Sequence, residues 1–319
     1  MQIHIHNRLD DAAAPLTRAE WDAVAQRLSF EATLSIGSDA RAFHARAPNI
    51  EVLVSSPKGV RDLLPFDAPR LRLLFVTWAG LDRLAPYDWV PPDVVVLNSS
   101  GAHALKAAEY VVMGLLMMKN GMAALARAQA DRTWSPAVGR TLAGRHLVII
   151  GLGAIGGATA TLARRLGMRV TGVRSTPRPH PDCDAVVGVD GLDSLLLIAD
   201  FVALALPQSP ATDRLLDRRR LSLLPAHAGI VNVGRGRTLD ETALCDLLDA
   251  GRIAAAVLDV FESEPLPPDH PLWSSPNLII SPHVAGSCGA RGRERLADFV
   301  AENVGRFVAG QAVTHTVSI

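Results

Sequence analysis

The stretch that decides the fold is LVIIGLGAIGG, which occupies residues 147–157. An apolar run precedes Gly151, Gly153 and Gly156, and the helical pattern of residues 158–166 follows them. In a dinucleotide-binding strand–turn–helix unit, the first glycine permits the tight turn and the second lets the backbone approach a pyrophosphate. The third allows close packing of helix on strand, with the phosphates at the helix N-terminus. Because strand and helix flank the glycines in the required order, the stretch predicts a dinucleotide site rather than an ordinary glycine-rich turn.

Short apolar runs alternate with helical patterns along the whole chain. The expected strands are residues 3–5, 33–36, 51–54, 72–77, 94–97, 146–150, 168–173, 200–206, 228–233, 255–260 and 277–281. The expected helices are residues 17–28, 40–47, 102–118, 241–250 and 291–309, with Gly251 as a C-terminal cap. Strands that alternate with helices predict parallel sheets that are covered on both faces.

Length and composition exclude several classes of protein. A chain of 319 residues is long enough for two domains, and 49% hydrophobic residues exclude wholesale disorder. Lys and Arg together equal Asp and Glu at 32 each, so the chain lacks the basic surplus of a general nucleic-acid binder. The cysteines are three and far apart (Cys183, Cys245 and Cys288), which predicts neither a disulfide framework nor a metal site. The start has no signal-peptide pattern, and the longest apolar run, residues 111–118, is too short for a membrane span, so we expect a soluble cytoplasmic protein.

The end of the next strand indicates which dinucleotide fits. An acidic residue there would bind the ribose hydroxyls of NAD, but the position holds Arg174, followed by Ser175, Thr176 and Arg178. A guanidinium and two hydroxyls can bind a 2′-phosphate, which a carboxylate would repel. The sequence therefore predicts a preference for NADP over NAD. The alternative is a solvated arginine in a site that accepts either cofactor.

Three polar groups follow apolar strands in the second half of the chain. They are Arg235 in GIVNVGRG, Glu264 in LDVFESEPLP and His283 in IISPHVAG. Singly, each has an ordinary alternative as a surface arginine, a solvated glutamate or a structural histidine. Because open α/β sheets place ligand clefts at the carboxyl ends of their strands, the three together predict a reactive site.

Long ordered motifs make the chain resemble the D-isomer-specific 2-hydroxyacid dehydrogenase family. They are NSSGAHALKAAEYVVMGLLMM, LAGRHLVIIGLGAIGG, NVGRGRTLDETALCDLL, AAVLDVFESEPLP and NLIISPHVAGS. The resemblance covers nearly the whole length and is most specific over residues 98–286. It implies that His283 donates a proton to the developing alkoxide of a 2-oxo acid, that Glu264 holds the imidazole, and that Arg235 binds the substrate carboxylate.

The resemblance implies further contacts. Trp78, Ala79 and Gly80 match the substrate loop, whose backbone N–H groups bind the carboxylate, although Trp78 is bulkier than is usual there. Asp259 matches the residue that accepts a bond from the nicotinamide carboxamide. The remaining expected cofactor contacts are Ala154, Ile155, Pro207, Thr212, Val233 and His283; for Pro207 and Thr212 a turn role is an equal alternative. Trp134 is either a lid residue that reaches the substrate from a partner subunit or, as we favour, a packed interface aromatic.

The expected architecture is two doubly wound parallel-sheet α/β domains. A Rossmann dinucleotide domain, residues 98–286, is inserted into a flavodoxin-like substrate domain, residues 1–97 plus 287–319. Two crossings between the domains suit hinge closure. By resemblance, we expect a homodimer formed through the dinucleotide domains, with no nucleic-acid or membrane partner.

The leading functional hypothesis is an NADP-dependent reductase of a small 2-oxo acid such as glyoxylate or hydroxypyruvate. A second hypothesis keeps the scaffold but oxidises formate or phosphite. Formate dehydrogenases of this superfamily typically carry Gln where this chain has Glu264, which argues against formate but not against phosphite. A third hypothesis is a dinucleotide-sensing binding protein that retains the three polar groups without catalysis.

Overall fold

The computed structural model describes residues 1–8, 17–25, 32–136, 139–287, 289–314 and 316–317. Residues 26–28 of the first expected helix, and Cys288, lie outside the described residues. The chain forms two compact units: Met1–His103 with Ser287–Ile319 (unit 1), and Ala104–Gly286 (unit 2). Unit 1 extends past residue 97 because the following turn is bonded back to it. Ser99 donates through Oγ to the carbonyl of Thr77 at 2.7 Å, and Asn98 donates through Nδ2 to that of Ala79 at 2.7 Å.

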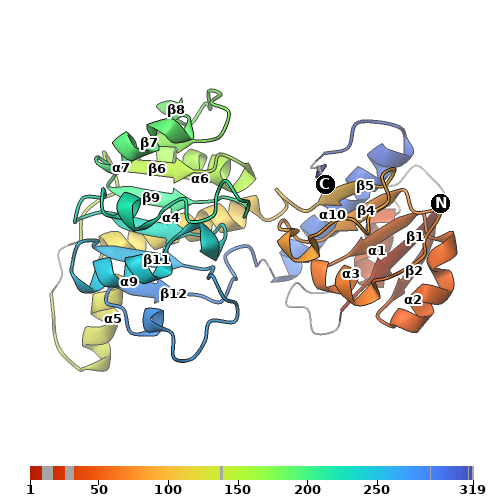
Figure 1. The fold of residues 1–319 in the computed structure, drawn as a ribbon, viewed down its shortest axis with the longest axis horizontal. Helices are drawn as coiled ribbons and strands as arrows, with labels where there is room; N and C mark the ends of the chain where they lie inside the picture. Colours follow the sequence, from red (N-terminus) through yellow and green to blue (C-terminus); the bar gives the residue numbers. More distant parts are fainter. Residues whose placement is uncertain (9–16, 26–31, 137–138, 288, 315, 318–319) are drawn as a thin grey trace. The chain divides into compact units, whose positions relative to one another are not determined.

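Unit 1 is built on a five-stranded parallel sheet in the order β2-β1-β3-β4-β5 (Figure 1). Its strands are β1 (Gln2–His6), β2 (Thr33–Gly37), β3 (Val52–Ser55), β4 (Leu73–Val76) and β5 (Val95–Asn98). Its helices are α1 (Arg18–Ala25), α2 (Ala40–Arg46), α3 (Pro57–Leu63) and α10 (Gly289–Val308). Alternate side chains of β4 enter two separate cores: Phe75 packs with residues of α1 and α10, and Leu74 packs with residues of α2 and α3. The sheet is therefore covered on both faces, as predicted.

Unit 2 is built on a seven-stranded parallel sheet in the order β12-β11-β10-β9-β6-β7-β8 (Figure 1). Its strands are β6 (His146–Ile150), β7 (Arg169–Val173), β8 (Ala185–Val187), β9 (Phe201–Leu204), β10 (Gly229–Asn232), β11 (Ala255–Leu258) and β12 (Leu278–Ile280). The chain runs from β6 outward through β7 and β8, and then returns to β9 on the other side of β6. This reversal makes the carboxyl ends of β6 and β9 the topological switch point, where open α/β sheets bind ligands.

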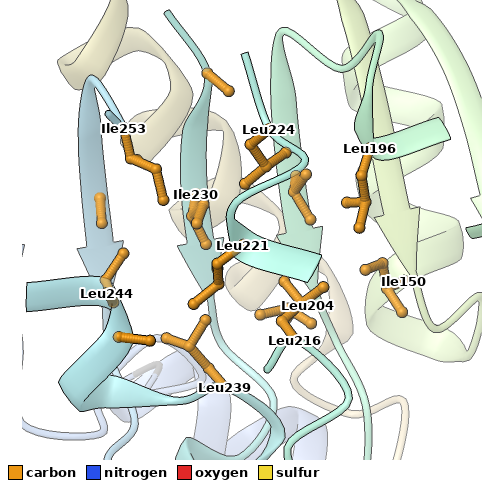
Figure 2. Packing of buried hydrophobic residues seen from close by; sticks show 14 of the residues in the cluster. Ile150, Leu196, Leu204, Leu216, Leu221, Leu224, Ile230, Leu239, Leu244 and Ile253 are labelled. Atoms are coloured by element: carbon orange, nitrogen blue, oxygen red, sulfur yellow. The ribbon is translucent and has the colours of Figure 1, made fainter. Parts of the chain in front are cut away.

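Helices cover both faces of this second sheet. They are α4 (Ala104–Lys119), α6 (Ala154–Arg165), α7 (Leu192–Leu196), α8 (Arg218–Leu221) and α9 (Glu241–Asp249). Helix α5 (Met122–Ala130) has no buried residue and packs against α4. Leu196, Leu221 and Leu244, from α7, α8 and α9, pack with Leu204 and Ile230 of the sheet (Figure 2). Helices α4 and α6 pack against each other, and their buried side chains join the core on the opposite face. The expected cap of α9 is confirmed, since Gly251 has a φ of +63°.

No single helix within the described ranges is long and apolar enough to cross a membrane. Ala104–Lys119 and Met122–Ala130 satisfy the length and composition criteria only as a pair, and that pair is bent by 65°.

Candidate active site

The glycine turn between β6 and α6 has the conformation that a dinucleotide site requires. Gly151 has a φ of +101°, and a Cβ there would lie 2.7 Å from the carbonyl oxygen of Ala205. A Cβ on Gly156 would lie 1.9 Å from the carbonyl oxygen of Gly151, so only glycine allows this approach of helix to turn. By contrast, a Cβ on Gly153 would meet nothing within 4 Å, and α6 begins there without a side-chain cap. An open glycine beside uncapped helix N–H groups fits the pyrophosphate of a dinucleotide.

The glycine turn is joined to the end of β7, where Arg174 lies. The N–H of Gly151 donates to the carbonyl of Val173 at 2.9 Å, so the two strand ends are adjacent. Arg174 is half-buried and donates through its own N–H to the carbonyl of Val187 at 3.1 Å. The other three residues of the predicted phosphate site follow it and are exposed: Ser175, Thr176 and Arg178.

The imidazole of His283 is paired with the carboxylate of Glu264. His283 Nδ1 lies 2.8 Å from Glu264 Oε2, and Glu264 Oε1 accepts the N–H of Phe261 at 3.2 Å. An ionised carboxylate only accepts, so Nδ1 carries the hydrogen in this pair and Nε2 is the nitrogen that can face a substrate. The two side chains are 34% and 21% exposed, so the pair is reachable from solvent.

A clamp around Asp259 holds the segment that carries His283. Asp259 is 1% exposed, and its carboxylate accepts the Ser281 hydroxyl at 2.5 Å and the N–H groups of Val284 and Ala285, each at 2.8 Å. His283 has a φ of +55°, a left-handed conformation that costs free energy for a residue other than glycine. These bonds, on both sides of His283, offset that cost. The expected bond from Asp259 to a nicotinamide carboxamide stays a prediction.

Helix α4 supports the same clamp. The hydroxyl of Tyr110 hydrogen-bonds Ser281 Oγ, which in turn bonds Asp259. Burial is the main cause that raises the pKa of Tyr110 above its ordinary value, although the hydrogen bond with Ser281 lowers it. The phenol is therefore held as a neutral hydrogen-bonding group.

Arg235 follows β10 between two tightly packed glycines. Its guanidinium donates to the carbonyl of Gly234 at 2.7 Å. A Cβ on Gly234 would lie 2.7 Å from the backbone N and O of Leu206, and a Cβ on Gly236 would lie 1.8 Å from the carbonyl carbon of Phe261. The Arg235 loop is thus packed against the loop that follows β9 and the loop that carries Glu264. The structure brings together, at the carboxyl ends of neighbouring strands, the three loops that bear Arg235, Glu264 and His283.

Other expected site residues have varied surroundings. Thr212 donates through Oγ1 to the carbonyl of Pro207 at 2.7 Å and accepts the N–H of Ser209 at 2.8 Å, which is a turn-stabilising pattern. The side chain of Val233 lies in the core, whereas Ala154 and Ile155 form the first turn of α6. Their cofactor contacts stay predictions.

In unit 1, residues 78–80 form a turn after β4. Ser99 donates through its N–H to the carbonyl of Trp78 at 3.3 Å, and Asn98 holds the carbonyl of Ala79 as described above. Ala79 is exposed, and Gly80 is half-buried. Trp134 in unit 2 is 96% exposed, so its indole ring is open to solvent among the described residues.

Four residues around this site were not predicted from the sequence. Tyr110 and Ser281 hold Asp259, Glu241 Oε1 accepts the Glu262 N–H at 2.7 Å, and His270 Nε2 lies 3.6 Å from Glu241 Oε2. Tyr110 is a polar group inside an apolar helix, and Ser281 follows the last strand immediately, which are weak signals at best. Glu241 lies in the first turn of a helix, where an acidic residue is commonly explained by the helix dipole. Only the folded structure brings it against the Glu264 loop.

Comparisons with known proteins agree with this geometry. Residues 112–285 match the model of the family described as "D-isomer specific 2-hydroxyacid dehydrogenase, NAD binding domain". A glyoxylate reductase from Korarchaeum cryptofilum is 33% identical over 285 residues, which is 86% of this chain and 84% of that protein. A D-3-phosphoglycerate dehydrogenase from Methanocaldococcus jannaschii is 31% identical over 85% of this chain, which spans 52% of that longer relative.

Two solved structures have the same fold over almost their full length. A family member from Aeromonas salmonicida has a TM-score of 0.85 at 28% identity, covering 99% of this chain and 98% of that one. A member from Xanthobacter autotrophicus, crystallised with NADPH and MES, has a TM-score of 0.82 at 28% identity, covering 99% and 97%. The chain therefore belongs to the D-isomer specific 2-hydroxyacid dehydrogenase family and is an NAD(P)-dependent oxidoreductase of that family.

Proposed function

We propose that this protein is an NADPH-dependent reductase of a small 2-oxo acid such as glyoxylate or hydroxypyruvate. The observation that carries the proposal is the 2.8 Å contact between His283 Nδ1 and Glu264 Oε2, on loops that follow neighbouring strands. A carboxylate partner favours the imidazolium form, which has a proton to give. Reduction of a carbonyl uses such a donor, whereas oxidation of a substrate without a hydroxyl proton does not.

Each residue has a defined part in the proposed reaction. Arg235 pairs with the substrate carboxylate and polarises the adjacent carbonyl. When bound, the nicotinamide cofactor supplies the hydride that the carbonyl carbon accepts. His283 donates the proton on Nε2 to the carbonyl oxygen, which becomes the hydroxyl of the product. The imidazole is then neutral, and its partial exposure lets it recover a proton from solvent while Glu264 holds the ring in place.

The proposed cofactor preference rests on the residues at the end of β7. Arg174, with Ser175, Thr176 and Arg178 after it, offers cationic and hydroxyl donors next to the glycine turn. These groups suit a 2′-phosphate. The relative from Xanthobacter autotrophicus that was crystallised with NADPH supports the same preference. The relatives named glyoxylate reductase, including one from Aeropyrum pernix at 32% identity, support the proposed substrate class.

The decisive experiment measures turnover of a panel of 2-oxo acids with NADPH and with NADH. We expect oxidation of NADPH with glyoxylate or hydroxypyruvate, at a higher kcat/KM than with NADH. Reduction of NADP by formate or phosphite, without turnover of 2-oxo acids, would instead favour the dehydrogenase alternative. Cofactor binding without turnover of any of these compounds would favour a dinucleotide-sensing protein.

We also propose that the protein forms a homodimer through an apolar face of unit 2. Five large apolar side chains on α4, α5 and the end of α6 are 38–45% exposed: Leu105, Met113, Leu116, Met122 and Leu166. Four of them, Met113, Leu116, Met122 and Leu166, line one surface pocket, and an exposed apolar surface of this kind is typical of a protein interface.

A further inference from the structure

Helix α9 begins with a buried carboxylate that the proposed reaction does not use. Glu241 is 4% exposed, and burying such a group costs free energy unless it is well bonded. It does not cap its helix, because Asp240 does so by accepting the N–H of Ala243 at 2.9 Å. Glu241 Oε1 instead accepts the N–H of Glu262 at 2.7 Å. Its side chain therefore binds the loop after β11.

That loop is the one that carries Glu264. The N–H of Phe261 is held by Glu264 Oε1 at 3.2 Å, and the next N–H, that of Glu262, is held by Glu241. Gly236, between Arg235 and α9, packs against the carbonyl carbon of Phe261. The segment from Arg235 to Glu241 thus contacts the Glu264 loop at two points, once through packing and once through a hydrogen bond.

A second part of the same loop also faces Glu241. His270 Nδ1 accepts the N–H of Leu272 at 3.3 Å, so the hydrogen of the neutral ring lies on Nε2. That nitrogen is 3.6 Å from Glu241 Oε2. Glu241 therefore lies between the beginning and the middle of the segment that joins β11 to β12.

The charged and titratable groups that face Glu241 are Glu262, Glu264, His270 and, one turn along α9, Cys245. Burial is the main cause that raises the pKa of Glu241 to about 7; the carboxylates of Glu262 and Glu264 raise it further, and the bond from the Glu262 N–H lowers it. Glu241 consequently changes charge near neutral pH, next to the carboxylate that pairs with His283.

We propose that Glu241 is a positioning residue that holds the Glu264 loop, and through it the orientation of His283. The inference rests on the proposed role of Glu264 and His283. Above pH 7 the ionised carboxylate of Glu241 adds negative charge beside Glu264. The contribution of Glu241 to the reaction should therefore depend on pH near neutrality.

Two variants separate the hydrogen bond from the charge. Glu241→Ala removes both, whereas Glu241→Gln keeps an oxygen that can accept the Glu262 N–H. The matched control is Asp184→Ala: Asp184 Oδ2 accepts the N–H of Val170 at 2.8 Å, the same kind of bond next to the opposite edge strand of the sheet, β8. The measurements are kcat and KM from pH 6 to 9, and hydrogen exchange of the peptide that spans residues 260–266 in the cofactor-free protein.

For Glu241→Ala we expect kcat to fall by about tenfold, with a smaller change in KM. The reason is that misplacement of the Glu264–His283 pair affects the transition state more than substrate binding. Exchange of residues 260–266 should accelerate. Glu241→Gln should recover much of kcat and restore slow exchange, but it should lose the pH dependence that the ionisation of Glu241 gives near pH 7. Asp184→Ala should match the wild type in kcat, pH profile and exchange of this peptide.

Wild-type kcat and exchange in Glu241→Ala would overturn the inference. So would equal losses in the two Glu241 variants with an unchanged pH profile, since these would reflect general structural damage. Failure of the proposed function would give a different result, namely a wild type that turns over no 2-oxo acid. Hydrogen exchange of residues 260–266 can still be measured in that protein. In that case faster exchange in Glu241→Ala supports the holding role, and unchanged exchange refutes it.

Discussion

Gly236 lies so close to Phe261 that a Cβ on Gly236 would be 1.8 Å from the carbonyl carbon of Phe261. Gly236 directly follows Arg235, and Phe261 belongs to the loop that carries Glu264. Two loops that carry different chemical groups are therefore packed backbone against backbone. Neither loop can move toward the other, and separating them would remove contacts that fix the position of Arg235.

Gly236→Ala should test this packing. Because the obstacle is backbone rather than a flexible side chain, the added methyl group must push the loops apart. We expect a destabilisation of about 1–3 kcal/mol and a loss of kcat/KM larger than the loss of stability explains. Thermal unfolding and steady-state kinetics measure the two effects.

Gly251→Ala serves as the control for glycine loss in general. Gly251 has a positive φ, but a Cβ there would meet nothing within 4 Å. This variant should lose some stability through backbone strain and keep its kcat. Wild-type kinetics in Gly236→Ala would show that the two loops can separate without consequence for the reaction.

The pairing of His283 with Glu264 leads to two linked predictions. His283→Ala should lower the rate of 2-oxo acid reduction by of order 10²–10⁴ if it donates the proton. Glu264→Gln should keep the ring in place but no longer favour its charge, so its rate should also fall below that of the wild type. Retention of most of the rate in His283→Ala would remove the proposed proton donor.

Two buried histidines in unit 1 predict a loss of stability in acid. His4 is 1% exposed and His6 is 4% exposed, and neither His4 Nε2 nor His6 Nδ1 has a hydrogen-bond partner among the described residues. Burial, followed by the nearby His6 and Arg46, lowers the pKa of His4 from 6.5 to about 4; burial also lowers that of His6. The unfolded chain therefore binds these protons more readily than the folded one.

The sign follows from this difference in proton binding. Burial of the neutral His4 side chain is compatible with the folded state above pH 6.5. The folded state loses stability progressively as pH falls toward 4, because the unfolded chain binds the proton first. His4→Leu, an apolar side chain of similar size, should therefore show a smaller fall in Tm between pH 7 and pH 4.5 than the wild type. An equal fall in both proteins would mean that His4 does not titrate on unfolding in this range.

Much of the fold could be predicted because strands buried on both faces appear in the sequence as continuous apolar runs. HLVII, which forms β6, is one example, and all five of its residues are buried. Strand β8 was missed because it has only three residues, lies at the sheet edge and is half-buried at best. Helix α5 was missed because none of its residues is buried, so it contributes nothing to the buried core from which the other helices were predicted.

The site was predictable only in part. Arg235, Glu264 and His283 each follow a strand, and parallel topology brings the ends of neighbouring strands to one edge. The left-handed backbone of His283 and the clamp by Asp259 depend on contacts between segments that are distant in the sequence. No local pattern encodes such contacts, and the same applies to Glu241.

The exposed apolar face of unit 2 predicts a dimer in solution. Light scattering coupled to gel filtration should give a mass of two chains, and Leu116→Glu, which puts a charge on α4 within this face, should give one chain. Leu197→Glu is the control, because Leu197 is 57% exposed but lies just after α7. A monomeric wild type, or a dimer that persists in Leu116→Glu, would contradict this interface.

Arg174 should determine the choice of cofactor. Arg174→Ala should lower kcat/KM with NADPH by about 10- to 100-fold, which corresponds to the loss of one charge-assisted hydrogen bond to a phosphate. The kcat/KM with NADH should stay within about twofold of the wild-type value. The distinction arises because only NADPH carries the 2′-phosphate, whereas both cofactors use the glycine turn. Arg169→Ala is the matched control, since Arg169 is exposed at the opposite end of the same strand. Equal losses with both cofactors would mean that Arg174 shapes the turn rather than binding the phosphate, and a wild type that prefers NADH would remove the basis of the assignment.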